Sequence, residues 1–326
     1  MKVNSSKFNN NFKGKSFISI NQLTRASEIK KIFRVADQMK KIVIKKKPSK
    51  MLRGFCIAEL FYQPSTRTFT SFLAAAKWLG AITIPIHGMS AYSSAVKGES
   101  IEDTVKSIYQ TTASDLIIIR HPADNSSERA AEASFIPIIN AGAGKKEHPT
   151  QAVLDLYTIK DELERMKNLK VVFLGDLKYG RTIKSLGKLL SLVDKNLQLF
   201  LVSPKILKMP RDLVKEWKAK GVKVYETDNL LKVLPEADVL YATRIQKEWF
   251  EAEGKLSLYR KLKGAYNITL KTLEKAKKKM IIMHPLPRVG EIAYEVDDDP
   301  RAVYFKQMRN GLYTRMALLK LILVGK

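Results

Sequence analysis

The stretch GFCIAELFYQPSTRTFTSFLAAAKWLG, residues 54–80, contains a change from one apolar pattern to another. The apolar run Phe55–Phe61 predicts a buried strand. After it, apolar residues recur at the spacing of a helix, at Phe72, Leu73, Ala76 and Leu79. Residues Ser65–Thr68 lie between the two patterns, so we expect them at the N-terminus of a helix that follows a strand.

This helix start carries three hydroxyl groups and a guanidinium, from Ser65, Thr66, Arg67 and Thr68. The first backbone N–H groups of a helix have no helical partners, and the helix dipole favours negative charge there. Together with the side chains, they predict a binding socket for an anion of the size of phosphate. In a simpler interpretation, Ser65 or Thr66 only caps the helix. Capping explains one hydroxyl but not Arg67 and Thr68, and this segment alone leaves both interpretations open.

Strands and helices are expected to alternate along the rest of the chain. Apolar runs predict further strands at 81–86, 115–119, 135–140, 171–174, 197–202, 222–225, 239–241 and 280–283. Helical spacing and start signals predict helices at 24–44, 100–110, 126–133, 148–164, from 181, 211–220, 229–234 and 308–324. Such alternation is typical of parallel strands joined by crossover helices.

With 326 residues, the chain is long enough for two domains with separate cores. We therefore expect an α/β protein with two doubly wound lobes, each a parallel sheet flanked by helices. The first lobe should span 1–150, completed by residues 303–326, and the second should span 151–302. The helix at 148–164 is expected to join the lobes, and the C-terminal helix to return to the first.

Composition favours a globular cytoplasmic protein, at 45% hydrophobic and 28% charged residues. The single cysteine, Cys56, excludes a disulfide within the chain and fits a reducing compartment. Residues 1–15 are polar and basic, and no apolar segment of signal-peptide length follows them. No apolar stretch approaches the length of a membrane span, so we expect no membrane partner.

The formal net charge is +26, from 58 Lys and Arg against 32 Asp and Glu, which raises the question of nucleic-acid binding. The lysines occur in runs such as Lys45–Lys47 and Lys277–Lys279, without interleaved aromatic residues and without a DNA- or RNA-binding signature. A solvated, lysine-rich surface is therefore the favoured interpretation over a nucleic-acid partner. In either case the positive field attracts small anions.

Polar residues collect directly after the predicted strands, where open parallel sheets bind their ligands. The clusters are Ser65–Thr68, Arg120, His148 with Gln151, Arg181, Arg244 with Gln246, and residues 284–288. Since His148 and Gln151 are three residues apart, they lie on one face of a helix start. Several arginines without a matching set of acids favour a ligand with several negative charges, because Arg binds phosphate and carboxylate through paired hydrogen bonds.

Other kinds of site lack their signatures. No Cys pair or cluster of His and carboxylates has metal-ligand spacing, so neither a metal nor a cofactor is expected; the four histidines are dispersed at 87, 121, 148 and 284. The absence of a G-x-S-x-G motif disfavours a Ser-His-Asp hydrolase. Gly175-Asp176 followed by Gly180 does not match G-x-G-x-x-G, which makes dinucleotide binding a weak hypothesis.

Seven motifs taken together resemble the aspartate/ornithine carbamoyltransferase family, on the side of the aspartate catalytic chain. They cover nearly the whole chain in order: 65–68, 97–99, 120–122, 148–151, 175–182, 243–246 and 284–288. Ornithine-type members typically have His-Cys-Leu-Pro near the end, where this chain has Pro285 in the second position. The Arg-x-Gln pattern of Arg244 and Gln246 is likewise of the aspartate type.

The resemblance implies a transferase of pyrimidine biosynthesis. In this reaction the amine of L-aspartate attacks carbamoyl phosphate to give N-carbamoyl-L-aspartate and phosphate, without a covalent intermediate or a metal. The first lobe would bind carbamoyl phosphate and the second aspartate. No protein general base is required if the phosphate receives the amine proton, so catalysis would consist mainly of positioning and electrostatics.

The resemblance also implies a role for each matching residue. The phosphate group would be held by Ser65, Thr66, Arg67 and Thr68. The carbamoyl oxygen, which gains negative charge during attack, would be bound by Thr68, Arg120 and His148. The carbamoyl amine would be oriented by Gln151 and by the backbone carbonyls of Pro285 and Leu286. The two aspartate carboxylates would be bound by Arg181, Arg244 and Gln246, and Lys97 would also bind aspartate.

Ser93 and Lys97 match family residues on a loop that reaches into the active site of a neighbouring subunit. Lys97 by itself would be an ordinary surface lysine, and only its place in the motif Lys97-Gly98-Glu99 assigns it to phosphate binding in trans. The resemblance therefore implies a homotrimer with shared active sites. It leaves open a separate regulatory chain that carries zinc, since this sequence contains no such domain.

The chain departs from the family pattern at several positions. Gln63 stands where the family usually has Glu, and Trp249 where it usually has Arg; in relatives these two residues help the site to close on aspartate. Phe69 and Leu73 replace an Arg and a Glu, and Ala143 and Gly290 each replace an Asp. We hypothesise weaker aspartate affinity or lost cooperativity. A carbamoyltransferase with another acceptor, or a basic nucleic-acid-binding protein on a vestigial enzyme fold, are the alternatives.

Overall fold

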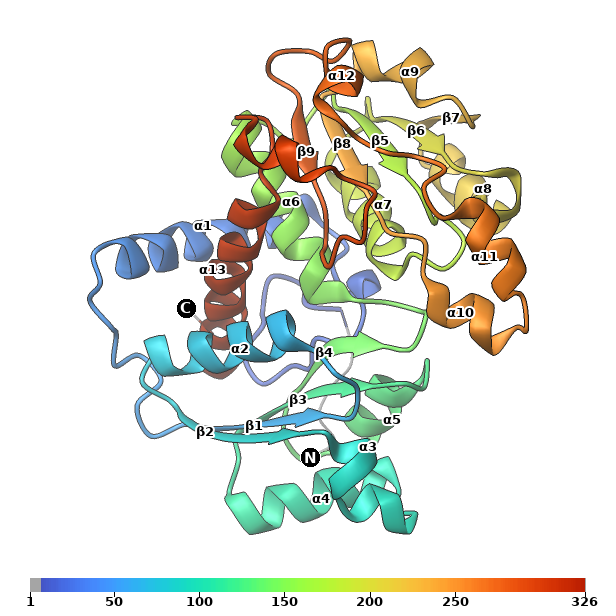
Figure 1. The fold of residues 1–326 in the computed structure, drawn as a ribbon. Helices are drawn as coiled ribbons and strands as arrows, with labels where there is room; N and C mark the ends of the chain where they lie inside the picture. Colours follow the sequence, from blue (N-terminus) through green and yellow to red (C-terminus); the bar gives the residue numbers. More distant parts are fainter. Residues whose placement is uncertain (1–6, 326) are drawn as a thin grey trace. The chain divides into compact units, whose positions relative to one another are not determined.

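The computed structural model describes residues 7–325, so the first six residues of the basic N-terminal stretch lie outside the described part of the chain. The chain divides into two compact units, Met1–Tyr157 with Arg309–Lys326, and Thr158–Met308. Each unit contains one parallel sheet with helices on both of its faces (Figure 1). The predicted α/β class with two parallel-sheet lobes is confirmed. No helix within residues 7–325 is both long enough and apolar enough to span a membrane.

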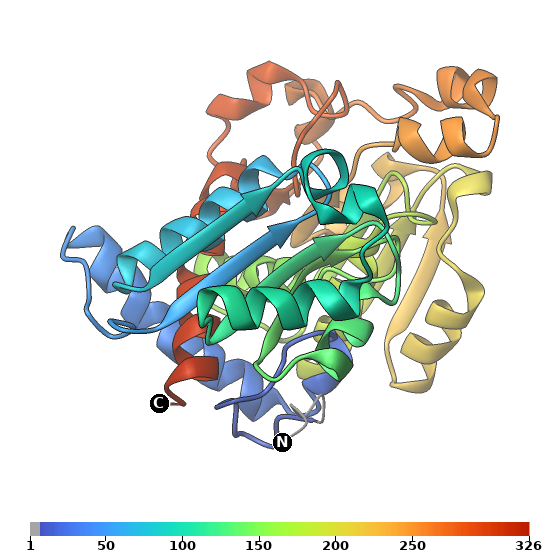
Figure 2. The same cartoon turned by 90° about the horizontal axis from the view of Figure 1, so that it is seen from below.

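The first unit contains a four-stranded parallel sheet in the order β2-β1-β3-β4 (Figure 2). Its strands are β1 (Cys56–Phe61), β2 (Ile82–His87), β3 (Leu116–His121) and β4 (Ile138–Ala143). Its helices are α1 (Ala26–Ile44), α2 (Thr66–Trp78), α3 (Met89–Tyr92), α4 (Ile101–Thr112) and α5 (Ser126–Ala133). It also contains the first part of α6 (Pro149–Leu163) and, from Arg309, the last part of α13 (Tyr304–Leu323).

The two faces of this sheet bury alternate residues of β1. Ala58 and Leu60 belong to a core cluster that includes Ile101 and Val105 of α4. Because strand residues alternate between faces, Phe61 points to the opposite side, where its ring meets that of Phe69 on α2 at 5.1 Å between centroids and an interplanar angle of 78°. The continuous apolar run therefore folds as a central strand that is covered on both faces.

Glu59 is the exception in this strand. It lies on the same face as Phe61, is fully buried, and neither of its carboxylate oxygens has a hydrogen-bond partner among the described residues. Burial raises the pKa of its carboxyl group from 4.5 to about 8. An ionised carboxylate without a partner is costly in an apolar interior, so Glu59 is protonated at neutral pH.

The second unit contains a five-stranded parallel sheet in the order β7-β6-β5-β8-β9. Its strands are β5 (Lys170–Leu174), β6 (Gln198–Val202), β7 (Lys223–Thr227), β8 (Val239–Ala242) and β9 (Ile281–Met283). Its helices include α7 (Arg181–Val193), α8 (Arg211–Ala219), α9 (Leu230–Val233), α10 (Lys247–Ala252), α11 (Leu256–Leu262) and α12 (Leu270–Leu273). Hydrophobic periodicity does not predict α3, α10, α11 and α12, because four to seven residues are too few to show it.

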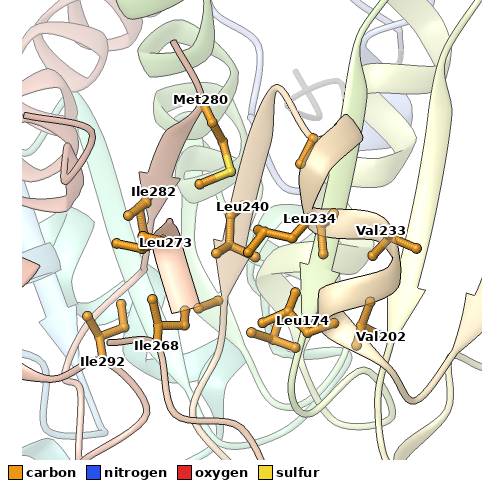
Figure 3. Packing of buried hydrophobic residues seen from close by; sticks show 14 of the residues in the cluster. Leu174, Val202, Val233, Leu234, Leu240, Ile268, Leu273, Met280, Ile282 and Ile292 are labelled. Carbon is orange, nitrogen blue, oxygen red and sulfur yellow. The ribbon is translucent and has the colours of Figure 1, made fainter. Parts of the chain in front are cut away.

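One face of the second sheet forms an aliphatic core (Figure 3). Leu174, Leu240 and Ile282, from three neighbouring strands, pack there against Leu234 and Leu273. The other face is covered by α7 and α8, which approach closely. A Cβ atom added at Gly187 of α7 would lie 2.4 Å from the Trp217 ring of α8, so glycine is required for this contact.

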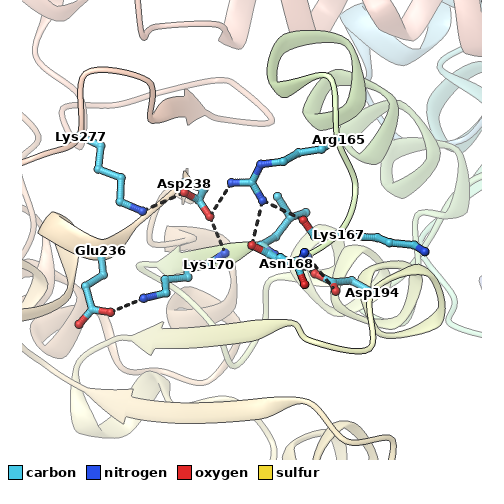
Figure 4. A network of polar contacts seen from close by, with 9 residues as sticks. Arg165, Lys167, Asn168, Lys170, Asp194, Glu236, Asp238 and Lys277 are labelled. Carbon is cyan, nitrogen blue, oxygen red and sulfur yellow. Dashed lines mark hydrogen bonds and ion pairs between the residues drawn. The ribbon is translucent and has the colours of Figure 1, made fainter.

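The amino end of the second sheet is closed by a network of ion pairs (Figure 4). Asp238, just before β8, accepts hydrogen bonds from the backbone of Lys170 at 2.9 Å and from the side chain of Lys277 at 2.9 Å. Arg165 lies 3.0 Å from the same carboxylate. Burial raises the pKa of Asp238, but these cations and the backbone donor hold it below its usual value. The amino end of the sheet is thus occupied by ion pairs within the protein, so a ligand-binding site is expected at the carboxyl end.

In each sheet the order of strands reverses direction at one point. The reversal falls between β1 and β3 in the first unit and between β5 and β8 in the second. Open α/β sheets bind ligands outside the carboxyl ends of the strands at such switch points. The loops after these four strands are therefore where a site is expected.

We predict that Glu59→Gln removes part of the pH dependence of stability. The folded protein holds the Glu59 proton up to about pH 8, whereas the unfolded chain releases it near pH 4.5. The contribution of Glu59 to the free energy of unfolding is fully present below pH 4.5. It falls by about 1.4 kcal/mol per pH unit as the pH rises from 4.5 to about 8. Urea unfolding at several pH values should show a flatter profile for Glu59→Gln and greater stability than the unmodified protein at pH 8.

The matched control is Glu226→Gln, which alters an exposed glutamate of β7 and should leave the profile unchanged. If the free energy of unfolding changed with pH equally steeply in Glu59→Gln and in the unmodified protein, the assignment of a buried, protonated Glu59 would be contradicted.

Candidate active site

The predicted anion socket lies at the start of α2, which begins at Thr66 directly after the loop from β1. Ser65 occupies the N-cap position in an extended conformation, yet its side chain makes no capping hydrogen bond. The capping interpretation is therefore wrong for Ser65. Thr66 and Arg67 are exposed, Thr68 is buried, and the first turn contains no acidic residue that would repel an anion. These features agree with an anion-binding helix start.

Arg120 stands beside this socket. It was expected just after the third strand but lies within β3, opposite Phe61 of β1 in the parallel register. The backbone carbonyl of Arg120 accepts a hydrogen bond from Tyr62 N at 2.9 Å. Its guanidinium Nη1 donates to the carbonyl of Ala141 on β4 at 3.3 Å. The switch point thus places a half-buried cation next to the loop that leads into α2.

His148 and Gln151 lie at the start of α6, as predicted, and both are buried, with 4% and 6% of their surfaces exposed. Thr68 Oγ1 and His148 Nε2 are 3.4 Å apart and hydrogen-bonded. The structure therefore brings together two residues that are far apart in the sequence and that were both predicted to contact the carbamoyl oxygen. The start of α6 adjoins the start of α2.

A buried carboxylate orients Gln151. Its side-chain Nε2 donates to Asp155 Oδ1 at 2.9 Å, one helical turn away. Because a carboxylate only accepts hydrogen bonds, the amide nitrogen of Gln151 must face Asp155, and the amide oxygen faces elsewhere as an acceptor. Sequence reasoning missed Asp155, although its spacing of four residues from Gln151 was a usable signal.

Asp155 in turn is compensated by Arg315 of α13. The Arg315 guanidinium is buried and lies 5.1 Å from the centre of the Phe72 ring. Burial lowers the pKa of Arg315 to about 10, and the charge of Asp155 opposes this shift. The C-terminal helix thus supplies the countercharge for the carboxylate that orients Gln151.

In the second unit, Asp176 joins the loops after β5 and β8. It is fully buried, and its Oδ1 accepts a hydrogen bond from Tyr179 N at 2.9 Å. Burial raises the pKa of Asp176, while backbone hydrogen bonds from Tyr179 and Gln246 oppose the increase. Its own backbone N–H donates to Thr243 Oγ1 at 3.1 Å. The loop that leads to Arg181 is thereby fixed to the Arg-x-Gln motif.

Arg244 follows β8 and is half-buried. Its two terminal nitrogens both donate to the carboxylate of Glu248 on α10, with a distance of 3.0 Å for Nη1. Burial raises the pKa of Glu248, but the hydrogen bond and charge of Arg244, a backbone hydrogen bond and the charge of Lys247 together hold it below its usual value. Gln246 occupies the N-cap position of α10, and Arg181 is the first residue of α7. These three of the four residues predicted to bind aspartate follow the switch-point strands β5 and β8, whereas the fourth, Lys97, belongs to the first unit.

A cavity of about 370 Å³ adjoins Arg244 at the carboxyl ends of β5 and β8. Its wall includes Gly175, Glu248, Lys263 and Tyr266. The sequence pattern did not single out Lys263 or Tyr266, because neither directly follows a strand. Within the described residues, no three His, Cys, Asp or Glu side chains form a group that could hold a metal ion.

The loop after β9 is held by His284. Leu286 N donates to His284 Nδ1 at 2.8 Å, and His284 Nε2 lies 2.8 Å from Glu291 Oε1. A backbone N–H can only donate, so Nδ1 is unprotonated and the ring proton is on Nε2, facing Glu291. Burial raises the pKa of Glu291, but the interactions with His284 and the backbone hydrogen bonds of Val289 and Glu291 together hold it below its usual value. This fixes the backbone of Pro285 and Leu286, whose carbonyls were predicted to contact the substrate.

Two models of known protein domain families match the chain. Residues 15–161 match the family model described as aspartate/ornithine carbamoyltransferase, carbamoyl-P binding domain. Residues 167–322 match the model described as aspartate/ornithine carbamoyltransferase, Asp/Orn binding domain. The chain belongs to the aspartate/ornithine carbamoyltransferase family.

Individual carbamoyltransferases are similar over almost their full length. The aspartate carbamoyltransferase catalytic subunit of Thermococcus onnurineus is 45% identical, over 96% of this chain and 98% of the relative. The solved catalytic subunit of Methanocaldococcus jannaschii aspartate transcarbamoylase has a TM-score of 0.86 at 46% identity, covering 94% of this chain and 97% of that one. Trypanosoma cruzi aspartate transcarbamoylase in complex with carbamoyl phosphate and aspartate has a TM-score of 0.89 at 39% identity, covering 96% and 98%.

The predicted in-trans residues of this carbamoyltransferase lie between α3 and α4. The Ser93 hydroxyl donates to the carbonyl of Met89 at 2.6 Å, and Lys97 is exposed at the end of a short 3-10 turn, Ser94–Lys97. Glu99 accepts a hydrogen bond from Thr104 Oγ1 at 2.9 Å, which ties the loop to α4. The loop thus presents Lys97 to solvent.

Two departures from the family pattern have local physical reasons. Phe69 is part of an aromatic group, since its ring lies 5.1 Å from those of both Phe61 and His87. Gly290 has a φ of 101°, a conformation that favours glycine and would strain an Asp. Nothing in the structure explains Ala143 or Leu73 beyond their fit to buried and half-buried positions.

We predict that Asp155→Asn lowers the free energy of unfolding by about 3 kcal/mol, because it leaves the Arg315 guanidinium buried without a countercharge. Adding Arg315→Met to Asp155→Asn should recover part of the loss, since the buried cation is then removed. Chemical denaturation of the single and double variants provides the measurement. Strictly additive losses would show that the two charges do not interact.

Proposed function

We propose that this chain transfers the carbamoyl group of carbamoyl phosphate to the amine of L-aspartate, giving N-carbamoyl-L-aspartate and phosphate in pyrimidine biosynthesis. The observation that carries the proposal is the hydrogen bond between Thr68 and His148 at 3.4 Å. It joins an anion-binding helix start to an imidazole, which is the combination that a phosphate with an adjacent carbonyl requires. The named substrates of the Trypanosoma cruzi relative support the same reaction.

Carbamoyl phosphate would bind to the first unit. Its phosphate would accept hydrogen bonds at the start of α2, from the backbone and from Ser65, Thr66, Arg67 and Thr68. Its carbonyl oxygen would accept from Thr68, Arg120 and His148. Negative charge grows on this oxygen as the amine attacks, so the three donors stabilise the transition state more than the ground state.

The carbamoyl amine group needs acceptors rather than donors. Asp155 fixes the Gln151 amide with its nitrogen inward, which leaves the Gln151 oxygen as an acceptor. The carbonyls of Pro285 and Leu286 are the other proposed acceptors. Orientation by three acceptors would present the carbonyl carbon to the incoming amine.

Aspartate would bind through Arg181, Arg244 and Gln246 of the second unit, with a further contact from Lys97. Attack forms the new C–N bond and breaks the C–O bond to phosphate. The departing phosphate takes the electron pair of that bond and accepts the proton that the amine loses. No protein base is needed, which agrees with a site whose proposed ligands are mainly donors.

We also propose a cytoplasmic homotrimer in which Ser93 and Lys97 act in the site of the neighbouring subunit. The exposed position of Lys97 supports this, because a phosphate-binding lysine presented to solvent can serve another chain. A zinc-carrying regulatory chain remains a hypothesis from the resemblance alone, and it would add mass beyond three copies of this chain.

The activity is tested by incubating the purified chain with labelled carbamoyl phosphate and separate acceptors: L-aspartate, L-ornithine, L-glutamate and putrescine. Labelled N-carbamoyl-L-aspartate should be the dominant product. Arg67→Ala should lower kcat about 100-fold or more, because it removes a cation from the phosphate and its leaving charge. The control Arg53→Ala alters an exposed arginine at the amino end of β1 and should retain activity. Transfer to ornithine but not to aspartate would overturn the proposal.

Shared sites are tested by mixing two inactive variants, Lys97→Ala and His148→Ala. If Lys97 acts in trans, mixed trimers contain some sites with neither substitution, and activity should reappear after subunit exchange. Light scattering of the unmixed protein should give the mass of three chains. No recovered activity in verified mixed trimers would place Lys97 in its own chain's site or outside any site.

A further inference from the structure

Gln246 is not held as an N-cap residue normally is. It precedes α10 with an extended backbone, but its side chain makes no capping hydrogen bond. Instead, its amide oxygen accepts a hydrogen bond from the indole Nε1 of Trp249 at 3.2 Å. The backbone N–H of Trp249 also donates to the carbonyl of Gln246 at 3.2 Å. Two hydrogen bonds therefore join these residues.

The indole bond decides the orientation of the amide. An indole N–H can donate but never accept, so only the oxygen of the Gln246 amide can face it. The NH₂ group of Gln246 must then point away from Trp249. In this orientation Gln246 offers hydrogen-bond donors, which suit a carboxylate and oppose an ammonium or amide NH₂ group.

Trp249 is itself held from its other side. Its ring stacks on that of Tyr179, with centroids 6.3 Å apart and an interplanar angle of 30°. The Tyr179 hydroxyl donates to Glu253 at 2.5 Å, and its backbone N–H donates to Asp176. The indole is half-buried between the loop after β5 and the start of α10. A ring fixed in this way can hold a neighbouring amide in one orientation.

We propose that Trp249 is a positioning residue that fixes the Gln246 amide with its NH₂ group toward the acceptor, and thereby favours a carboxylate at that point of the site. The inference rests on the proposed function, because it takes Gln246 as an aspartate-binding residue. It gives Trp249 a role of its own at a position where a charged residue is usual in the family. The chain lacks the usual charge at this position, but the indole N–H of Trp249 fixes the orientation of the Gln246 amide.

The decisive variant is Trp249→Phe, which keeps an aromatic ring for stacking and removes the N–H group. The Gln246 amide can then rotate and present its oxygen. We expect the KM for L-aspartate to rise about threefold to tenfold, as for the loss of one hydrogen bond, with the KM for carbamoyl phosphate unchanged. Trp249→Tyr lacks the same N–H group and provides a second test if the Phe variant does not fold.

A change in selectivity separates positioning from a general structural role. The two monoamides of aspartate, L-asparagine and L-isoasparagine, each replace one carboxylate by a group with NH₂ donors. A rotated Gln246 accepts from such a group, so the preference for L-aspartate over one of the two monoamides should fall in Trp249→Phe. A uniform loss of activity with all acceptors, or a matching rise in the KM for carbamoyl phosphate, would overturn the proposal.

A double-mutant cycle with Gln246→Ala completes the test. Once the amide is gone, Trp249→Phe should cause no further change in the KM for L-aspartate; additive effects would count against the proposal. The control Trp78→Phe, at a half-buried position of α2, should leave aspartate kinetics unaltered.

The single variants of this cycle also distinguish failure of the positioning role of Trp249 from failure of the proposed function. If Gln246→Ala raises the KM for L-aspartate and Trp249→Phe does not, the positioning role alone is wrong. If the unmodified chain forms no N-carbamoyl-L-aspartate, or if Gln246→Ala leaves its use of aspartate unchanged, the functional assignment beneath it fails.

Discussion

Parallel pairing of β1 with β3, and of β5 with β8, is the constraint on which the candidate loops of each unit depend. Parallel neighbours end at the same edge of a sheet, and their crossover connections return there through helices. In the first unit this register sets Arg120 opposite Phe61, so a cation stands beside the loop into α2. In the second, Leu174 pairs with Ala242, so the loops that carry Arg181 and Arg244 begin side by side.

The candidate residues are held by buried or half-buried polar groups rather than by apolar packing alone. Asp155 orients Gln151, Asp176 fixes two loops, and Glu291 fixes the proton of His284. A buried polar group is costly unless it is hydrogen-bonded, so each of these hydrogen bonds penalises any conformation that would break it. Asp176 is satisfied at Oδ1 only, since its Oδ2 has no hydrogen-bond partner among the described residues. Glu59 shows the contrast, because it is buried without a partner and its carboxyl group has to remain protonated.

Much of the fold followed from local patterns. The apolar run before Ser65, the helical spacing after it and the alternation of strands and helices predicted the two parallel sheets, and the polar clusters after strands predicted the loops of the site. These features depend on neighbours in the sequence, where periodicity is informative. The strand order was not predictable in this way, since it depends on pairings between distant segments.

Tertiary partners account for most of what sequence reasoning missed. Asp155 matters because Arg315, 160 positions later, balances its charge. Trp249 illustrates a different limit, because its partner Gln246 is only three residues away: as a sequence difference Trp249 is only the loss of an expected charge, and the hydrogen bond from its indole N–H to Gln246 is visible only in the structure. Trp249 also lies on the short helix α10, whose six residues give no periodic signal.

The pairing of Arg244 with Glu248 does not prevent Arg244 from binding a substrate. A guanidinium has five N–H donors, and the two bonds to Glu248 use one from each terminal nitrogen. Nε–H and the remaining hydrogen on the nearer terminal nitrogen form a second edge, which matches a carboxylate as well as the first. Glu248 therefore holds one edge and fixes the direction of the other, much as Trp249 fixes the direction of the Gln246 amide. One short helix, α10, would then orient two neighbouring donor groups, and the geometry of its first turn would set which acceptor the site can bind.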